Sequence, residues 1–83
     1  MQIDRYEVNK MAVSYNKLWK LLIDKKMKKM QLRDMAGIGS STLAKLGKDQ
    51  PVSMDVIMKI CNVLKCDIGD VMEILPEEIQ QNN

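Results

Sequence analysis

The strongest constraint on this chain is a glycine, Gly37, that separates two short segments with helical spacing of apolar residues. A glycine at the end of such a segment stops the helix, because it adopts the left-handed backbone conformation without steric cost. The first segment covers about residues 30–36, and the second, residues 40–48, begins almost at once. So short a connection predicts two helices at a steep angle, the second standing out from the body. The residues expected to face inward are Leu32, Met35, Ala36, Ile38, Leu43 and Leu46.

Helical spacing recurs in three further segments. A helix is predicted over about residues 14–26 with Ser14 as N-cap, and another begins after the cap Ser53. A fifth helix is predicted over residues 67–75, where Asp67 and Asp70 have the spacing of a capping box. The inward residues of these three helices are Tyr15, Leu18, Trp19, Leu22, Ile57, Ile60, Cys61, Leu64, Val71, Met72 and Leu75. With no Phe and eight Met, the composition favours packed helices over a sheet, so the predicted fold is all-α with five short helices.

A length of 83 residues allows one domain. Residues 14–75 form the predicted domain. Residues 1–13 lack clear periodicity and are predicted to form an N-terminal arm, either a short strand or a loose segment. Residues 76–83 begin with proline, continue as a polar stretch and are predicted to be a flexible tail.

The charge is divided unequally along the chain. Residues 14–50 carry nine basic and three acidic side chains, a net charge of +6, whereas residues 51–83 carry two basic and six acidic ones, a net charge of −4. Such a division within one small domain favours a surface that binds a polyanion, although lysine-rich faces are also common on proteins that bind none.

The stretch from Leu32 to Leu46 resembles the helix-turn-helix of the Cro/repressor-type, or Xre, family, especially its compact single-domain branch. The similarity covers about residues 15–74 and rests on Leu32, Gly37, Ile38, Thr42-Leu43 and Lys45-Leu46. It implies a lambda-repressor-like fold and a usually dimeric, sequence-specific regulator that reads double-stranded DNA with the third helix. Departures from the pattern are Lys29, Arg33 and Gly39, where the family commonly has Gln, Ala and Ser.

If Leu43 and Leu46 face inward, the opposite side of the third helix faces the DNA. The residues predicted to contact bases are Ser40, Ser41, Thr42, Ala44 and Lys45. Short hydroxyl side chains allow the helix end to approach closely, lysine can reach a guanine edge, and alanine can touch a thymine methyl group. For Ser40, capping of the helix is the favoured alternative, and Ser41 and Lys45 are favoured as contacts.

Lysines crowd the start of the second helix, where positive charge is unfavourable beside the helix dipole. A bound phosphate would reverse that effect. The residues predicted to contact phosphates are Lys28, Lys29, Arg33 and Lys48, with a solvated basic loop as the alternative. Trp19 could stack on a base, but its place among apolar residues favours the core.

A homodimer on an approximately palindromic site is predicted, with Ile68, Val71, Met72 and Leu75 as its interface. The sequence has no His and only two Cys, which excludes a Ser-His or Cys-His dyad and a structural zinc site within one chain. We therefore expect no enzyme activity, cofactor or small-molecule substrate.

The sequence also lacks a secretory signal and a membrane span, which predicts a reduced, cytoplasmic protein. The alternative function is a protein-binding helical module, antitoxin-like or anti-repressor, in which the acidic C-terminal helices are the working surface. The two functions predict different salt dependence, because only DNA binding releases many counterions.

Overall fold

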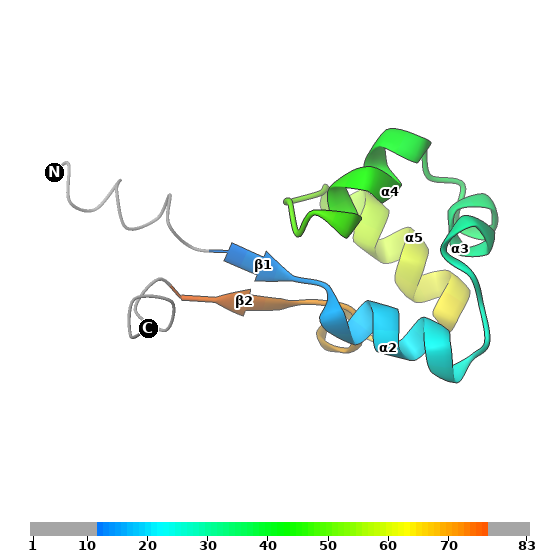
Figure 1. Ribbon diagram of the computed structural model, residues 1–83, viewed down its shortest axis with the longest axis horizontal. Coiled ribbons are helices and arrows are strands. Elements are labelled where there is room, and N and C mark those ends of the chain that lie inside the picture. Colours follow the sequence, from blue (N-terminus) through cyan, green and yellow to red (C-terminus); the bar gives the residue numbers. More distant parts are fainter. Residues whose placement is uncertain (1–11, 77–83) are drawn as a thin grey trace, which may run out of the picture.

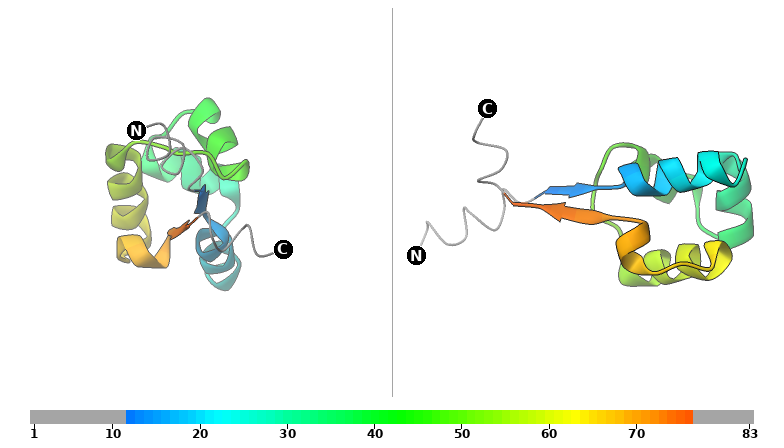
Figure 2. Two further views of the ribbon diagram at one scale, coloured as in Figure 1. Left: turned by 90° about the vertical axis from the view of Figure 1, so that its left-hand side faces the viewer. Right: turned by 90° about the horizontal axis from the view of Figure 1, so that it is seen from below.

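A computed structural model describes residues 12–76 of the chain, and Figure 1 shows how its elements are arranged. They are β1 (Ala12–Ser14), α2 (Asn16–Asp24), α3 (Lys29–Ala36), α4 (Ser40–Gly47), α5 (Met54–Leu64), a 3₁₀ turn η1 (Ile68–Asp70) and β2 (Glu73–Leu75). The helices form one body, and the ribbon of β1 and β2 extends from it, as the right-hand view in Figure 2 also shows. The predicted arm and tail lie largely outside the described residues, but Ala12 and Val13, assigned to the arm, belong to β1.

The turn between α3 and α4 has the predicted geometry. Gly37 has φ +69° and ψ 34°, the left-handed conformation, and its backbone N–H donates to the carbonyl of Arg33. α4 begins at Ser40, three residues after the glycine. Because a residue with a Cβ is strained at this φ, glycine sets where α3 stops and therefore how α4 leaves it.

The core is aliphatic apart from one tyrosine. The buried apolar residues are Tyr15, Leu18, Leu22, Leu32, Ala36, Ile38, Leu46, Ile57, Ile60, Leu64 and Val71. Leu43 and Trp19 are half-buried and pack against this core. The predicted inward position of Met35 is wrong, because this side chain is 61% exposed. In so short a helix Leu32 and Ala36, four residues apart, already fill the inner side.

Tyr15 connects the start of the domain to the loop that follows α4. Its hydroxyl donates to the carbonyl of Gln50 at 2.8 Å, and its backbone N–H donates to Oδ1 of Asp49 at 3.3 Å. Burial, and secondly the charge of Asp49, raise the pKa of the Tyr15 hydroxyl. The prediction of Ser14 as N-cap of the next helix is wrong: α2 begins at Asn16 with Tyr15 as its N-cap, and Ser14 Oγ accepts from the Asn16 N–H just before the helix.

The predicted fifth helix is wrong. Asp67 and Asp70 form the expected capping box, but it opens only the single turn η1, after which the chain becomes β2. β2 pairs antiparallel with β1, with Val13 opposite Ile74. The described residues therefore contain four α-helices and a two-stranded sheet instead of five helices.

Two physical reasons account for the strand. Gly69 lowers the helix propensity of a segment that has only a few residues in which to form a helix. The strand β1, some sixty positions earlier, offers backbone hydrogen bonds that the segment takes up as β2. Lys17 on α2 holds the segment in place, since its Nζ donates to the Gly69 carbonyl at 3.2 Å and pairs with Glu73 at 3.7 Å.

Candidate nucleic-acid interface

α4 presents a polar face to solvent and an apolar face to the core. Leu46 is fully buried and Leu43 half-buried, which fixes the orientation of the helix. Of the residues predicted to contact bases, Ser40, Ser41, Ala44 and Lys45 are exposed, and Thr42 is half-buried. Lys48, predicted to contact phosphate, is exposed at the C-terminal end of α4. The four exposed candidates therefore share one short helix whose inner side is held by leucine packing.

Arg33 joins the two helices on either side of the turn. Its Nη1 donates to Ser40 Oγ at 3.0 Å, and its Nε donates to Asp34 Oδ1 at 3.1 Å. The side chain of Arg33 is only 24% exposed. This arginine, predicted from the sequence as a phosphate contact, is thus occupied by contacts within the chain that fix the start of α4.

The interpretation of Ser40 as a helix cap is wrong. The N-cap of α4 is Gly39, which has no side chain to accept a hydrogen bond, and Ser40 is the first residue of the helix. Its Oγ accepts from Arg33 instead. A serine hydroxyl has one hydrogen to donate, and this bond does not use it.

The start of α3 is basic and has no acidic residue in its first turn. Lys28 is the N-cap, and an ammonium group cannot accept a hydrogen bond from the helix amides. The Lys28 N–H donates to Oε1 of Gln31 at 2.7 Å. Lys29 Nζ lies over the ring of Trp19, 4.3 Å from its centroid, a cation–π contact. Both lysines are exposed.

The residues predicted to form a dimer interface differ in exposure. Val71 is fully buried in the core of its own chain, so this residue cannot lie in a subunit interface. Ile68 is 37% exposed, and Met72 and Leu75 are half-buried. Ile74, 58% exposed on β2, was not predicted, because only a strand makes Glu73 and Leu75 point opposite to it.

A second apolar surface lies beside the basic start of α3 and was also missed. Ile23 and Met30 are 74% and 58% exposed, and they line a depression together with Trp19, Leu22 and Met27. The signal in the sequence was that Ile23 falls outside the inward stripe of its helix.

Residues 12–76 contain no helix long and apolar enough to cross a membrane, and no group of three or more metal-ligating side chains.

Comparison with known proteins assigns this geometry to a family. The model of the Cro/C1-type HTH DNA-binding domain matches residues 17–77, from the first turn of α2 through β2. Among solved structures, the crystal structure of transcriptional regulator VanUg, form II, is 60% identical in sequence and superimposes with a TM-score of 0.78. The match covers 81% of this chain and 89% of that one. A comparison with curated proteins gives no match.

Proposed function

The chain belongs to the family of Cro/C1-type helix-turn-helix DNA-binding domains, and we propose that it is a sequence-specific transcriptional repressor that reads the major groove with α4. The single observation that carries this proposal is the amphipathic setting of α4. Its leucines anchor it to the core, while Ser40, Ser41, Ala44 and Lys45 face solvent. An α-helix with short side chains at its first turn fits the width of the major groove.

In this proposal Ser40 acts as a hydrogen-bond donor to DNA. Its Oγ accepts from Arg33 with one of its two lone pairs, and its hydrogen stays available to donate. Ser40 therefore favours acceptors such as guanine N7 and O6 or a phosphate oxygen. Arg33 contributes by positioning Ser40 more than by touching phosphate itself.

The remaining candidates have separate roles. Lys45, one helical turn beyond Ser41, reaches a guanine edge, and Ala44 contacts a thymine methyl group. Thr42 is half-buried and supports the base-contacting face from its side. Lys28, Lys29 and Lys48 bind phosphates and fix the register of the protein on the duplex.

We further propose a homodimer that places two α4 helices in successive major grooves, about 34 Å apart, on an approximately palindromic site. The proposed interface combines Ile68, Met72 and Leu75 with the exposed Ile74. Occlusion of a promoter by the bound dimer would repress transcription.

A second candidate function is protein binding through an apolar surface. The observation that favours it is the depression around Trp19, Ile23 and Met30, where large apolar side chains are exposed. An apolar contact of this kind depends weakly on salt, whereas each neutralised phosphate steepens the salt dependence of DNA binding.

The decisive experiment is selection of bound duplexes from a random pool at physiological salt, followed by titration of the selected duplex at several salt concentrations. We expect enrichment of an inverted repeat and an affinity that falls steeply with salt. A protein that binds no duplex at low ionic strength would rule out the DNA-binding function and favour the protein-binding one.

A further inference from the structure

The two cysteines meet where α5 ends. Lys65 adopts the left-handed conformation, with φ 55° and ψ 53°, and its N–H donates to the carbonyl of Cys61. The N–H of Cys66 donates to the same carbonyl at 3.1 Å. A helix end of this kind commonly brings together the side chains of the two residues that its longest hydrogen-bonded turn joins. Here those residues are Cys61 and Cys66.

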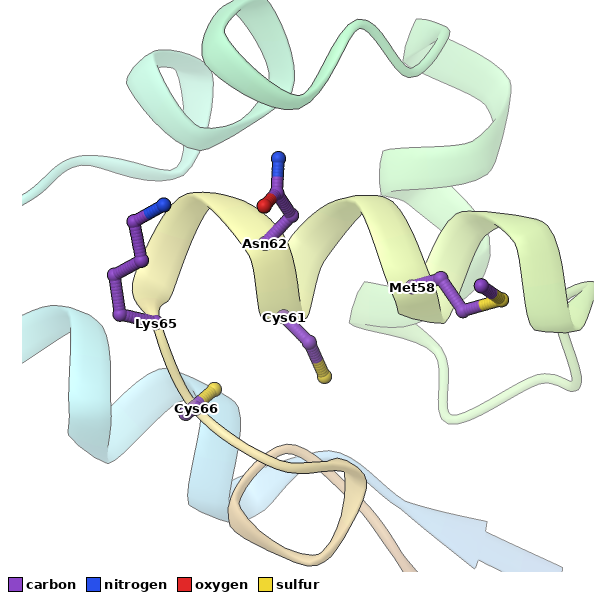
Figure 3. A pocket seen from close by; sticks show the side chains of 5 residues that line it. All are labelled: Met58, Cys61, Asn62, Lys65 and Cys66. Atoms are coloured by element: carbon purple, nitrogen blue, oxygen red, sulfur yellow. The ribbon is translucent and has the colours of Figure 1, made fainter.

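Figure 3 shows both cysteines on the side of α5 that faces away from α3 and α4. With Met58, Asn62 and Lys65 they line one shallow surface depression. Both are free thiols and half-buried, and both line a depression that is open to solvent. An apolar pair such as leucine and valine would fill this position equally well, but two thiols add chemistry that packing does not require.

The two thiols are not equivalent. Burial raises the pKa of Cys66 to about 11, with further contributions from the charge of Cys61, a hydrogen bond with Cys61 and the charge of Asp70, while Lys25 acts in the opposite direction. Because only the thiolate is nucleophilic, Cys66 is the poorer first nucleophile at neutral pH. This favours Cys61 over Cys66 as the first nucleophile.

We propose that Cys61 and Cys66 form a redox-active dithiol that closes to an intrachain disulfide on reaction with a small-molecule disulfide such as glutathione disulfide. The thiolate of Cys61 attacks one sulfur of glutathione disulfide, which gives a mixed disulfide and one glutathione thiolate. Cys66 loses its proton and attacks the sulfur of Cys61, which releases the second glutathione. Each departing thiolate takes up one of the two protons that the cysteines lose, so the protein is oxidised by two electrons and glutathione disulfide is reduced to two glutathiones.

The disulfide would join the last turn of α5 to the segment that leads into η1. η1, which follows that segment, packs against both α2 and α5, so the bond would tie α5 to this part of the domain. The proposal does not depend on the function of α4, and closing the bond is expected to leave duplex affinity unchanged within about twofold.

The test uses the full chain, equilibrated with buffers of reduced and oxidised glutathione and quenched with acid. Mass spectrometry of the intact protein then separates dithiol, disulfide and mixed disulfides. We expect the disulfide, lighter by two hydrogens, to be the main oxidised product. The effective concentration of one thiol at the other should be at least about tenfold higher in native buffer than in denaturing urea, because the helix end holds the thiols together. Equal values in the two solvents, or a protein with glutathione on both cysteines as the main product, would overturn the proposal.

Two serine variants test the order of attack. Cys66→Ser should accumulate a mixed disulfide at Cys61, whereas Cys61→Ser should react more slowly with glutathione disulfide. Circular dichroism checks that each variant is folded. Equal rates in two folded variants would overturn the assignment of Cys61 as the first nucleophile.

Discussion

The N-termini of α3 and α5 are built in opposite ways. At the N-terminus of α5 the chain itself supplies a cap: Ser53 Oγ accepts from the Val56 N–H at 3.2 Å, and Asp55 places negative charge in the first turn. α3 begins instead with Lys28 and Lys29, and no acidic residue stands in its first turn. Each positive charge there costs about 0.3–1 kcal/mol relative to a neutral residue. The N-terminus of α5 is thus stabilised within the chain, whereas that of α3 has no such compensation, which is why we propose it as a phosphate contact.

The largest expected effect concerns α4, the helix that follows α3. Lys45→Ala should weaken binding to the selected duplex by about 1–3 kcal/mol, or roughly fivefold to 150-fold, and relax the preference at one base pair. Lys59→Ala on α5 is the matched control, since Lys59 pairs with Asp55 at 3.1 Å and lies on a helix that is not expected to contact DNA. Fluorescence titration with the selected duplex and its single-base variants measures both effects. Unchanged affinity and preference in Lys45→Ala would exclude this lysine as a base contact.

Replacing both lysines at the start of α3 tests whether its end binds phosphate. The double variant Lys28→Ala/Lys29→Ala should bind all duplexes about tenfold more weakly. The slope of log K against log salt should become shallower by about one for each phosphate that the variant leaves unneutralised. Titration at four or more salt concentrations gives the slope. If variant and parent have the same slope, the two lysines make no phosphate contact.

Two single substitutions test whether the N-caps of α3 and α5 account for this difference. Lys28→Ser gives α3 a cap like that of α5, and should raise the free energy of unfolding by about 1 kcal/mol while weakening DNA binding. Ser53→Ala should lower the free energy of unfolding by about 1 kcal/mol and leave DNA binding unchanged. Urea denaturation gives the free energy of unfolding of each variant, and duplex titration gives its affinity for DNA. A Lys28→Ser variant that gains stability and keeps full affinity would show that α3 needs no external anion.

The smallest expected effect concerns the contact between α3 and α4. Ser40→Ala removes one donor and should weaken binding to the selected duplex by about 0.5–1.5 kcal/mol. The effect should occur only where the base offers an acceptor at that position. Arg33→Met should relax the same preference with Ser40 intact, because the hydroxyl then has both lone pairs free to accept as well as its hydrogen to donate. Repeating the duplex selection with each variant compares the two preferences directly. An altered preference in only one variant would show that Arg33 does not act through Ser40.

The candidate site could be predicted from the sequence because its signals are local. Gly37 determines the turn, and the spacing of Leu43 and Leu46 determines which side of α4 is exposed. Neither depends on a distant partner. The role of Arg33 could not be predicted, since a guanidinium seven residues before Ser40 has no spacing signal for a bond that forms only when the turn folds.

The C-terminal segment shows the opposite case. Val71, Met72 and Leu75 have helical spacing, yet the chain forms η1 and β2. The strand β2 contains only Leu75 of these three residues, and in so short a segment helical spacing does not exclude a strand. The partner strand β1 decided between them.

The helix-turn-helix follows from the sequence alone, because Gly37 and the leucine spacing beside it act within a few turns of helix. The strand β2, the burial of Val71 and the bond from Arg33 to Ser40 exist only in the folded chain. Each of them rests on a contact between segments, whose free energy no local propensity contains.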